Sequence, residues 1–307
     1  MAARSRVIAV VNQKGGVGKT TTAVNLAACF AASERATLLV DLDPQGNASS
    51  AFGIRDATHQ IYDALIGSCL MKEAVVPTAL SHLHVVPAGP DLVGAEIELV
   101  SAMSRERRLA SALAELRESY EVIVIDCPPS LGLLTLNALT AADSIILPMQ
   151  CEYYALEGLA RLIDTIELVR EHLNPDLRLE GIVLTMVDLR NNLSRQVEAE
   201  VRSHFGGKVY RTRIPRNVRL SEAPSHGKPI ILYDIQSRGA VAYLRLAEEI
   251  LTEMRLSHAP RKPPPPLGPS VPRPTLEKPQ LADVAWREPD DPILDPIVDP
   301  ILGGDES

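Results

Sequence analysis

Cysteine is scarce in this sequence. Only four cysteines occur among 307 residues, and no two of them have the CxxC spacing of redox and zinc sites. The pattern supplies neither a disulfide framework nor a zinc module, and it favours a reduced cytosolic protein. The four are Cys29, Cys69, Cys127 and Cys151.

Long apolar runs are also missing near the start of the chain. A basic segment, 1–6, is followed by the short apolar run 7–11. Such a run is too short for a signal peptide or a membrane span, so we expect no membrane partner. The residue spacings of a helix-turn-helix or a zinc finger are absent as well, which argues against base-specific reading of DNA.

Proline is distributed unevenly, because residues 259–307 hold 13 of the 24 prolines. Proline at this density removes backbone donors and favours extended polyproline geometry. We therefore predict one compact domain over 1–257 and a disordered, Pro-rich acidic tail over 258–307. The tail contains the single tryptophan, Trp286, and a repeated Asp-Pro-Ile unit. It is either a short linear motif that docks a partner or a solvated extension, and the sequence leaves both open.

A glycine-rich segment, KGGVGKTT at 14–21, directly follows the apolar run 7–11. This order predicts a strand, a loop and a helix that begins near Lys19. Glycines let backbone N–H groups converge on an anion, and the helix dipole adds positive charge there. Lys19 would neutralise β- and γ-phosphates, and Thr20 would offer a hydroxyl to Mg²⁺. The predicted nucleotide contacts are Lys14, Gly15, Gly16, Val17, Gly18, Lys19, Thr20 and Thr21.

This loop departs from the usual pattern, which has glycine at the position of Gln13, and it carries a second lysine, Lys14. A glycine-rich match of this kind, taken alone, is also compatible with an ordinary turn between a strand and a helix. The acidic segments that follow argue for the phosphate-binding interpretation.

Two further apolar segments, 37–40 and 122–125, end in aspartate, in DLDPQGN at 41–47 and DCPPS at 126–130. If they are strands parallel to 7–11, all three ends meet at the carboxyl edge of an open α/β sheet, where ligands bind. Asp126 is then placed to hold Mg²⁺ through water, and Asp43 to orient or deprotonate an attacking water. The alternative for a lone aspartate is a helix cap or a turn former.

Helical and strand patterns alternate through the rest of the compact region. Such alternation predicts a mostly parallel, doubly wound α/β sheet of the P-loop NTPase class. The expected helices are 131–142 and 156–173, and the expected strands are 144–147 and 179–184. Long helical patterns at 92–117 and 240–254 would cover the sheet or build a dimer flank.

With these motifs the sequence resembles the ParA/Soj family of partition ATPases, in the deviant Walker-A group that also holds MinD and the nitrogenase iron protein. The resemblance runs from about residue 7 to about residue 253. Its motifs are KGGVGKTT, DLDPQGN, GAEIELV at 94–100, DCPPSLGLLTLNAL at 126–139, QCEYYALEGL at 150–159 and IPRNVRLSEAPSHGKPIILYD at 214–234. No comparable match covers the last fifty or so residues.

The resemblance implies an ATP hydrolase that uses Mg²⁺, is weak alone and is stimulated by a partner. Its catalytic residues would be Lys14, Lys19, Asp43 and Asp126, and Thr20, Asp43 and Asp126 would surround the metal. In the family, the lysine that matches Lys14 crosses a dimer interface to the phosphates of the facing subunit. The chain would therefore form a homodimer around ATP, with Gly15 small because two backbones nearly meet there. The alternative for Lys14 is a solvated surface lysine.

The resemblance also places Pro215 and Asn217 in a loop that packs the adenine ring. A β-turn explains the same Ile-Pro-Arg-Asn stretch equally well. The inference that the chain binds ATP and not GTP therefore depends mainly on the resemblance to the family.

A basic region is hidden in an acidic chain. Residues 188–229 hold nine Lys and Arg against four Asp and Glu, a net charge of +5 where the whole chain carries −8. Such a run is often only a solvated surface. Arg190 and Arg219 match the DNA-contacting arginines of the family, and Lys208 and Arg216 are further candidates. Contacts of this kind read the phosphate backbone, so we expect nonspecific binding of double-stranded DNA that weakens with salt.

The implied role is segregation of a chromosome or plasmid by a cytoplasmic, nucleoid-associated protein, with a ParB-like centromere-binding protein that stimulates hydrolysis. The alternative is a positioning or scaffold ATPase that uses the tail as its adaptor for a polar or division complex. A membrane-bound regulator of the MinD type is disfavoured, because this chain ends in proline and acid where those relatives have an amphipathic helix.

Overall fold

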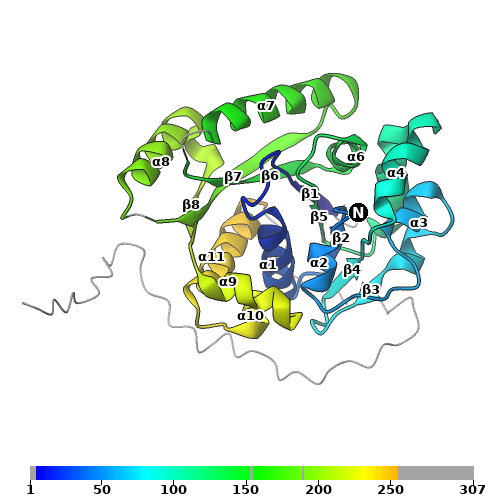
Figure 1. Ribbon diagram of the computed structural model, residues 1–307, viewed down its shortest axis with the longest axis horizontal. Coiled ribbons are helices and arrows are strands. Elements are labelled where there is room, and N and C mark those ends of the chain that lie inside the picture. The colour runs from blue at the N-terminus through cyan, green and yellow to red at the C-terminus, as the bar shows by residue number, and fades with distance from the viewer. Residues whose placement is uncertain (1–4, 153–154, 189, 255–307) are drawn as a thin grey trace, which may run out of the picture.

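An eight-stranded sheet runs through the centre of the protein (Figure 1). The structure is a computed structural model, and it describes residues 5–152, 155–188 and 190–254. The strand order is β3-β4-β2-β5-β1-β6-β7-β8, and all neighbours are parallel except the pair β3 and β4. The strands are β1 Arg6–Val10, β2 Thr37–Asp41, β3 Val76–Pro77, β4 Leu83–Val86, β5 Val122–Asp126, β6 Ser144–Gln150, β7 Arg178–Val187 and β8 Val209–Pro215.

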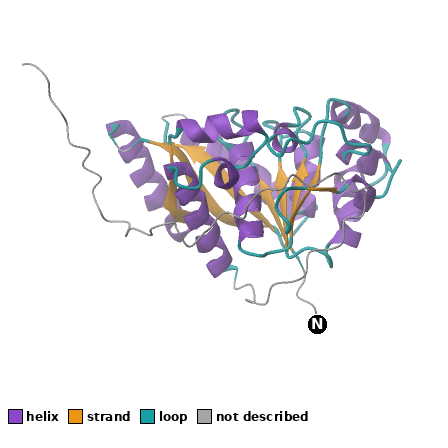
Figure 2. Cartoon of the chain, turned by 90° about the horizontal axis from the view of Figure 1, so that it is seen from below, coloured by secondary structure: helices purple, strands orange, loops and turns teal. Residues whose placement is uncertain are grey.

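Helices cover both faces of the sheet (Figures 1 and 2). One face packs against α3 Ile61–Ile66, α4 Leu92–Glu98, α5 Arg108–Leu113, α6 Leu133–Ala141, α7 Ala155–His172 and α8 Asn192–Phe205. The other packs against α1 Lys19–Ala32, α2 Asn47–Ser50, α9 Val218–Glu222, α10 Ile230–Tyr233 and α11 Arg238–Glu253. The predicted doubly wound, mostly parallel fold is therefore confirmed.

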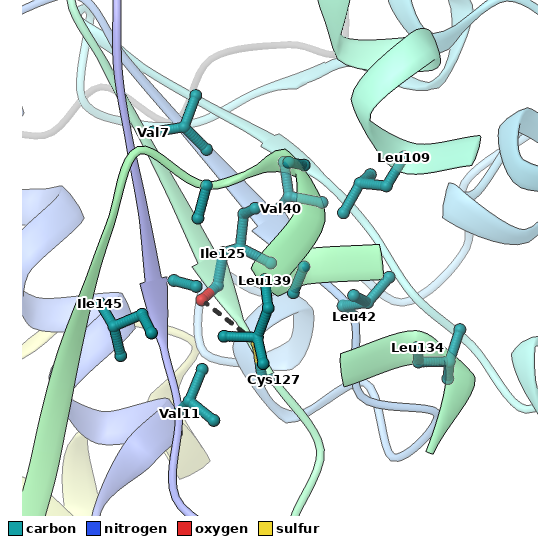
Figure 3. Close-up of a cluster of buried hydrophobic side chains, with 14 of the residues drawn as sticks. Val7, Val11, Val40, Leu42, Leu109, Ile125, Cys127, Leu134, Leu139 and Ile145 are labelled. Carbon is teal, nitrogen blue, oxygen red and sulfur yellow. Dashed lines mark hydrogen bonds between the residues drawn. The ribbon is translucent and has the colours of Figure 1, made fainter. Parts of the chain in front are cut away.

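The central strands are apolar between their end residues, as expected where both faces of a sheet are covered. Val7, Val40 and Ile125 lie in one core cluster with Leu139 of α6 (Figure 3). The next residues along the strands, such as Ile8 and Val124, join α1 and α11 in a second cluster on the opposite face. Two apolar faces per strand explain why these segments read as continuous apolar runs.

The predicted elements at 131–142, 144–147, 156–173, 179–184 and 240–254 correspond to α6, β6, α7, β7 and α11 with shifted ends. The long helical pattern predicted over 92–117 is divided into several short helices. The chain there forms α4 and then short pieces, with Ala102 extended and Ser104 at a φ of 51°. The pieces are η2 Leu99–Ser101, η3 Arg105–Arg107, α5 and η4 Ala114–Leu116.

A tertiary contact separates two of these short pieces, η3 and α5. Asn137 of α6 donates from Nδ2 to the Arg105 carbonyl at 2.9 Å, and its Oδ1 accepts from the Leu109 N–H at 3.0 Å. These bonds satisfy backbone groups that a continuous helix would pair internally. The remaining short 3₁₀ helices are η1 Met71–Ala74, η5 Gly206–Lys208 and η6 Ala223–His226.

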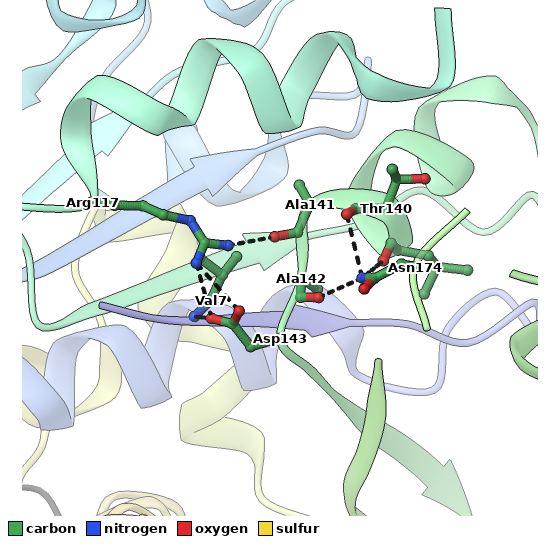
Figure 4. Close-up of polar contacts among 8 residues, drawn as sticks. Val7, Arg117, Thr140, Ala141, Ala142, Asp143 and Asn174 are labelled. Carbon is green, nitrogen blue, oxygen red and sulfur yellow. Dashed lines mark hydrogen bonds and ion pairs between the residues drawn. The ribbon is translucent and has the colours of Figure 1, made fainter. Parts of the chain in front are cut away.

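Asp143 ties several elements together at the amino edge of the sheet (Figure 4). Its Oδ2 accepts from the Val7 N–H at 2.7 Å, and its Oδ1 lies 3.2 Å from Nη1 of Arg117. Arg117 also donates to the Ala141 carbonyl at 2.8 Å. Asn174 donates to the Ala142 carbonyl at 2.8 Å, so the end of α6 is held from two directions.

Replacing Asp143 by Ala is expected to lower the free energy of unfolding by about 2 kcal/mol, because the Val7 N–H and the Arg117 guanidinium lose their carboxylate partner. Urea unfolding followed by circular dichroism measures this. Asp176→Ala is the matched control, since Asp176 is an exposed neighbour in the same surface depression. Equal stability of the two variants would contradict the assignment.

The predicted boundary near residue 257 and the tail beyond it lie outside the described residues, so both stay predictions. Within the part of the chain that the structure describes, no helix combines the length and apolarity needed to cross a membrane.

Candidate functional site

The glycine-rich loop joins the carboxyl end of β1 to α1, and residues 12–18 are called the phosphate loop below. Gly16 and Gly18 have φ angles of 75° and 86°, a left-handed conformation that L side chains rarely adopt. Gly18 is the N-cap residue, so α1 begins at Lys19 as predicted. The loop therefore leads into a helix N-terminus, whose free N–H groups and dipole favour an anion.

Gly15 differs from these two glycines. A Cβ atom added to Gly15 would meet no atom within 4 Å. No atom of the described residues in one chain therefore excludes a side chain at this position.

Side chains from neighbouring strands hold the phosphate loop in place. Thr185 of β7 donates to the Val17 carbonyl at 2.8 Å, and Gln150 of β6 donates to the Gly16 carbonyl at 2.9 Å. Neither Thr185 nor Gln150 is among the predicted site residues. They lie more than a hundred residues from the loop in sequence, and only the parallel pairing of β6 and β7 beside β1 brings them there.

The two lysines of the loop have different surroundings. Lys19 is 6 % exposed and donates from Nζ to the Lys14 carbonyl at 3.0 Å. Burial lowers the pKa of Lys19, while Asp126 and Asp43 oppose this shift. Lys14 keeps 44 % of its side chain exposed and forms an ion pair with Glu152. Lys19 is thus fixed at the helix start, whereas Lys14 lies at the surface.

Three carboxyl groups gather beside the phosphate loop. Asp41 and Asp126 end β2 and β5 as direct partners in register, and both are fully buried. Burial raises the pKa of Asp41 to about 6. Burial, followed by the nearby Asp41, raises the pKa of Asp126 well above its usual range. Asp43 is 8 % exposed, and its Oδ1 accepts from the Gln45 N–H at 3.0 Å.

Asp41 is not among the predicted site residues, although it opens the DLDPQGN motif. Its Oδ2 accepts from both the N–H and the hydroxyl of Ser49, each at 2.7 Å. The Ser49 hydroxyl in turn accepts from the Ala88 N–H at 3.0 Å. Asp41 therefore positions α2 and the loop that carries Asp43. The sequence signal was present, since the first aspartate of the motif ends the strand.

The oxygens of Asp126 are buried, and neither has a hydrogen-bond partner of normal geometry among the residues that the structure describes. The Thr20 hydroxyl approaches this carboxylate and partly offsets the rise of its pKa. A buried carboxylate without partners next to a hydroxyl fits a hydrated divalent cation. Among the described residues, no group of three or more His, Cys, Asp or Glu side chains is arranged to hold a metal alone. A cation here would therefore also need ligand oxygens.

A cavity of about 260 Å³ adjoins the phosphate loop through the start of α1. Its walls come from α1, α2 and the segment 220–230, and they include Thr20, Thr21, Asn25 and Lys228. Pro215 and Asn217, the predicted adenine contacts, do not line it. Asn217 caps α9, because its Oδ1 accepts from the Arg219 N–H at 2.8 Å. Asn217 is therefore a helix cap and not part of the β-turn considered as the alternative. Its contact with adenine, and that of Pro215, stay predictions.

The predicted DNA contacts separate into two places. Arg190 follows β7, and Arg216 and Arg219 follow β8, whose last residue pairs with the last residue of β7. These three arginines therefore lie near one another at the carboxyl edge. Arg190 pairs with Asp188 at 2.9 Å, and Arg219 with Glu222 at 2.9 Å. Lys208 is exposed but precedes β8, at the opposite end of that strand.

Comparison with known proteins supplies the family. Residues 5–179 match the family described as AAA domain. The chain is 60 % identical over 248 residues to the chromosome partitioning protein ParA of Myxococcus xanthus, covering 80 % of this chain and 88 % of that protein. It is 58 % identical over 247 residues to the sporulation initiation inhibitor protein Soj of Bacillus subtilis, covering 80 % and 98 %.

Among solved structures, the cobyrinic acid a,c-diamide synthase of Mycobacterium smegmatis with bound ATP analogue and magnesium is similar. Its TM-score is 0.72 at 38 % identity, and the match covers 85 % of this chain and 98 % of that one. The partition protein and Soj are more similar in sequence to this chain than the synthase is, and each matches 80 % of the chain. Because both relatives are more than half identical to this chain and are covered over most of their own length, the chain belongs to the ParA/Soj family of chromosome-partitioning ATPases.

Proposed function

We propose that this ATPase is a nucleotide-controlled clamp on DNA. Mg-ATP joins two copies of the chain, the joined pair binds the nucleoid without base preference, and a ParB-like partner stimulates hydrolysis and release. One observation supports the binding of Mg-ATP in this proposal. The two oxygens of Asp126 have no hydrogen-bond partner among the described residues, and they lie beside Thr20, next to Lys19 at the start of α1. The M. smegmatis relative, solved with an ATP analogue and magnesium, supports this choice of ligand.

Each residue of the site has a separate task in this scheme. Lys19 and the N–H groups of the phosphate loop bind the β- and γ-phosphates, and Thr20 and Asp126 hold Mg²⁺, which neutralises phosphate charge when bound. Asp43 orients the attacking water and accepts its proton. Asp41 keeps Asp43 in place through α2. Hydrolysis then depends on positioning and charge, which fixed backbone groups supply without reorganisation.

Two features support a dimer around the nucleotide. Lys14 lies at the surface with an ion pair to Glu152 that either partner can leave, so its ammonium is free to reach a phosphate of a facing copy. The space beside Gly15 is open within one chain, which leaves room for a second backbone. Both residues belong to the same exposed part of the phosphate loop, where the two copies would meet.

Arg190, Arg216 and Arg219 support the DNA contact. They extend from the same sheet edge as the phosphate loop, so a dimer would present the set twice on one assembly. Two of the three are already paired with acids, so phosphate groups must compete with Asp188 and Glu222. Binding through such contacts releases counterions and weakens as salt rises.

The test is DNA binding with ATP, ADP or no nucleotide, measured by fluorescence anisotropy on two unrelated duplexes at two salt concentrations. We expect tight binding with ATP alone, equal for both duplexes and much weaker at the higher salt. Binding that ignores the nucleotide would overturn the clamp. Absence of DNA binding in every state would favour the positioning ATPase instead.

Replacing Arg219 by Ala should weaken DNA binding about tenfold while ATP-dependent dimerisation persists, because each copy loses one phosphate contact. The slope of log affinity against log salt should fall by about 2 for the dimer. Arg170→Ala is the matched control, since Arg170 also forms an exposed ion pair with a glutamate three residues away. If both variants bound DNA like the parent, the arginine assignment would be wrong.

A further inference from the structure

An exposed apolar row lies along α4 and the residues after it. Val93, Ile97, Val100 and Met103 are 56, 74, 57 and 88 % exposed, and we call these four side chains the α4 stripe. They are half of the eight large hydrophobic side chains that are exposed in the described part of the chain. Single exposed apolar residues are ordinary, but a contiguous row marks an interaction site.

The opposite side of the same segment is apolar as well. Leu92, Ala95 and Leu99 are buried in the core cluster that covers this face of the sheet. A helix that is apolar on both sides is normally covered on both sides. The α4 stripe therefore calls for a covering surface that one copy of the chain does not provide within its described residues.

The segment that carries the α4 stripe meets the loop after Asp126, and the chain just before α4 meets the loop after Asp43. A Cβ on Gly132, in the loop after Asp126, would lie 2.3 Å from Oε1 of Glu96. A Cβ on Gly46, in the loop after Asp43, would lie 3.1 Å from the Ala88 carbonyl oxygen. The α4 stripe is therefore attached to the carboxyl edge of the sheet, the edge that carries the phosphate loop, and α4 stands next to α6 there (Figure 1).

The charges at the two ends of the α4 stripe are opposite. Asp91 is exposed two residues before it, and Arg107, which donates to the Leu173 carbonyl at 3.3 Å, is exposed four residues after it. Glu98, exposed within the segment, accepts from the Tyr62 hydroxyl at 3.0 Å. When two such rows pair antiparallel about a two-fold axis, the acidic end of each meets the basic end of the other. Ile97 and Val100, in the middle of the row, then lie closest to their own counterparts. The same arrangement with a parallel partner would bring like charges together.

We infer that the α4 stripe packs antiparallel against the same stripe of a second copy when nucleotide joins the two chains. This inference rests on the ATP-dependent dimer proposed above and adds a contact to it. The part of the stripe from Val93 to Val100 spans about 10 Å at the helical rise of about 1.5 Å per residue, and Met103 follows beyond the extended Ala102. Because Glu96 of α4 meets the loop after Asp126, this contact links the closure of the dimer to the arrangement of that aspartate.

Cross-linking tests the geometry directly. Ile97→Cys in a Cys69→Ser background should be joined to its counterpart by a short bismaleimide when the full chain is incubated with Mg²⁺ and a non-hydrolysable ATP analogue. Leu168→Cys in the same background is the matched control, because Leu168 is 57 % exposed on α7, away from the stripe. Light scattering on each sample reports whether a dimer formed. A dimer that is not cross-linked through residue 97 would overturn the inference.

Charge exchange provides a second test that does not depend on cysteine. Asp91→Lys alone and Arg107→Asp alone should each weaken the ATP-dependent dimer by about tenfold, and the double variant should recover it. Thermal unfolding of each variant checks that the fold is intact. If the parent chain stays monomeric with the analogue, the proposed dimer itself fails. If the parent dimerises and the exchange has no effect, only the stripe contact is wrong.

Discussion

Lys19→Ala should abolish ATP-dependent dimerisation. The lysine ammonium is buried at the start of α1, where no solvent ion can take its place beside the phosphates. Charge-assisted hydrogen bonds contribute about 1.5–3 kcal/mol each, so loss of these contacts should weaken ATP binding by about a hundredfold. Isothermal titration with Mg-ATP measures the affinity, and light scattering measures the oligomeric state.

Lys14→Ala distinguishes the two lysines of the loop. Because Lys14 lies at the surface, its loss should leave ATP binding by the single chain nearly unchanged while the dimer is lost. The Lys19 variant loses both properties, since dimerisation depends on bound nucleotide. Dimers of the Lys19 variant at saturating Mg-ATP, or normal dimers of the Lys14 variant, would contradict these separate roles.

Asp43→Ala should trap the chain as a DNA-bound dimer with ATP. Its carboxylate lies beside Asp41 and Asp126, and within the described part of the chain it accepts one hydrogen bond, from the Gln45 N–H of its own loop. Removing a water-orienting base lowers a hydrolysis rate by about a hundredfold or more, while the phosphate contacts remain. Phosphate release, with and without a ParB-like partner and DNA, measures the rate, and size-exclusion chromatography with ATP shows the trapped dimer.

Asp41→Asn is the informative comparison for that result. Asp41 holds Ser49 and α2, so its loss should slow hydrolysis by displacing Asp43 and should also lower thermal stability. Asp43→Ala should slow hydrolysis without a comparable loss of stability. Normal turnover by the Asp43 variant would remove this residue from the catalytic site.

Local sequence was sufficient for the features that depend on neighbouring residues. Gly16 and Gly18 adopt the left-handed conformations that a phosphate-binding turn needs, and α1 starts at Lys19 as predicted. The runs 37–40 and 122–125 are buried strands that end in aspartate. Backbone preference and apolar period determine such features within a few residues, so they can be read without knowledge of the fold.

Other features of the fold and of the site depend on packing between segments that are far apart in sequence. The side chain of Asn137 binds the backbone at Arg105 and Leu109, within the helical pattern of 92–117. The sequence of that segment does not predict this contact. Gln150 and Thr185 support the phosphate loop only because β6 and β7 lie beside β1. Lys208 proves to lie at the other end of β8 from Arg216 and Arg219, although all three belong to one basic stretch of sequence.

Short segments specify the glycine-rich loop, the two acidic strand ends and the parallel α/β class, because the spacing and side-chain chemistry within each segment are enough to define them. The packing of the folded chain was needed to bring Asp41 and Asp126 together in register. Packing also leaves both Asp126 oxygens without hydrogen-bond partners, and the apolar row of α4 exposed, among the residues that the structure describes. Burial and pairing depend on which distant segments pack together, and a local sequence pattern does not contain that information.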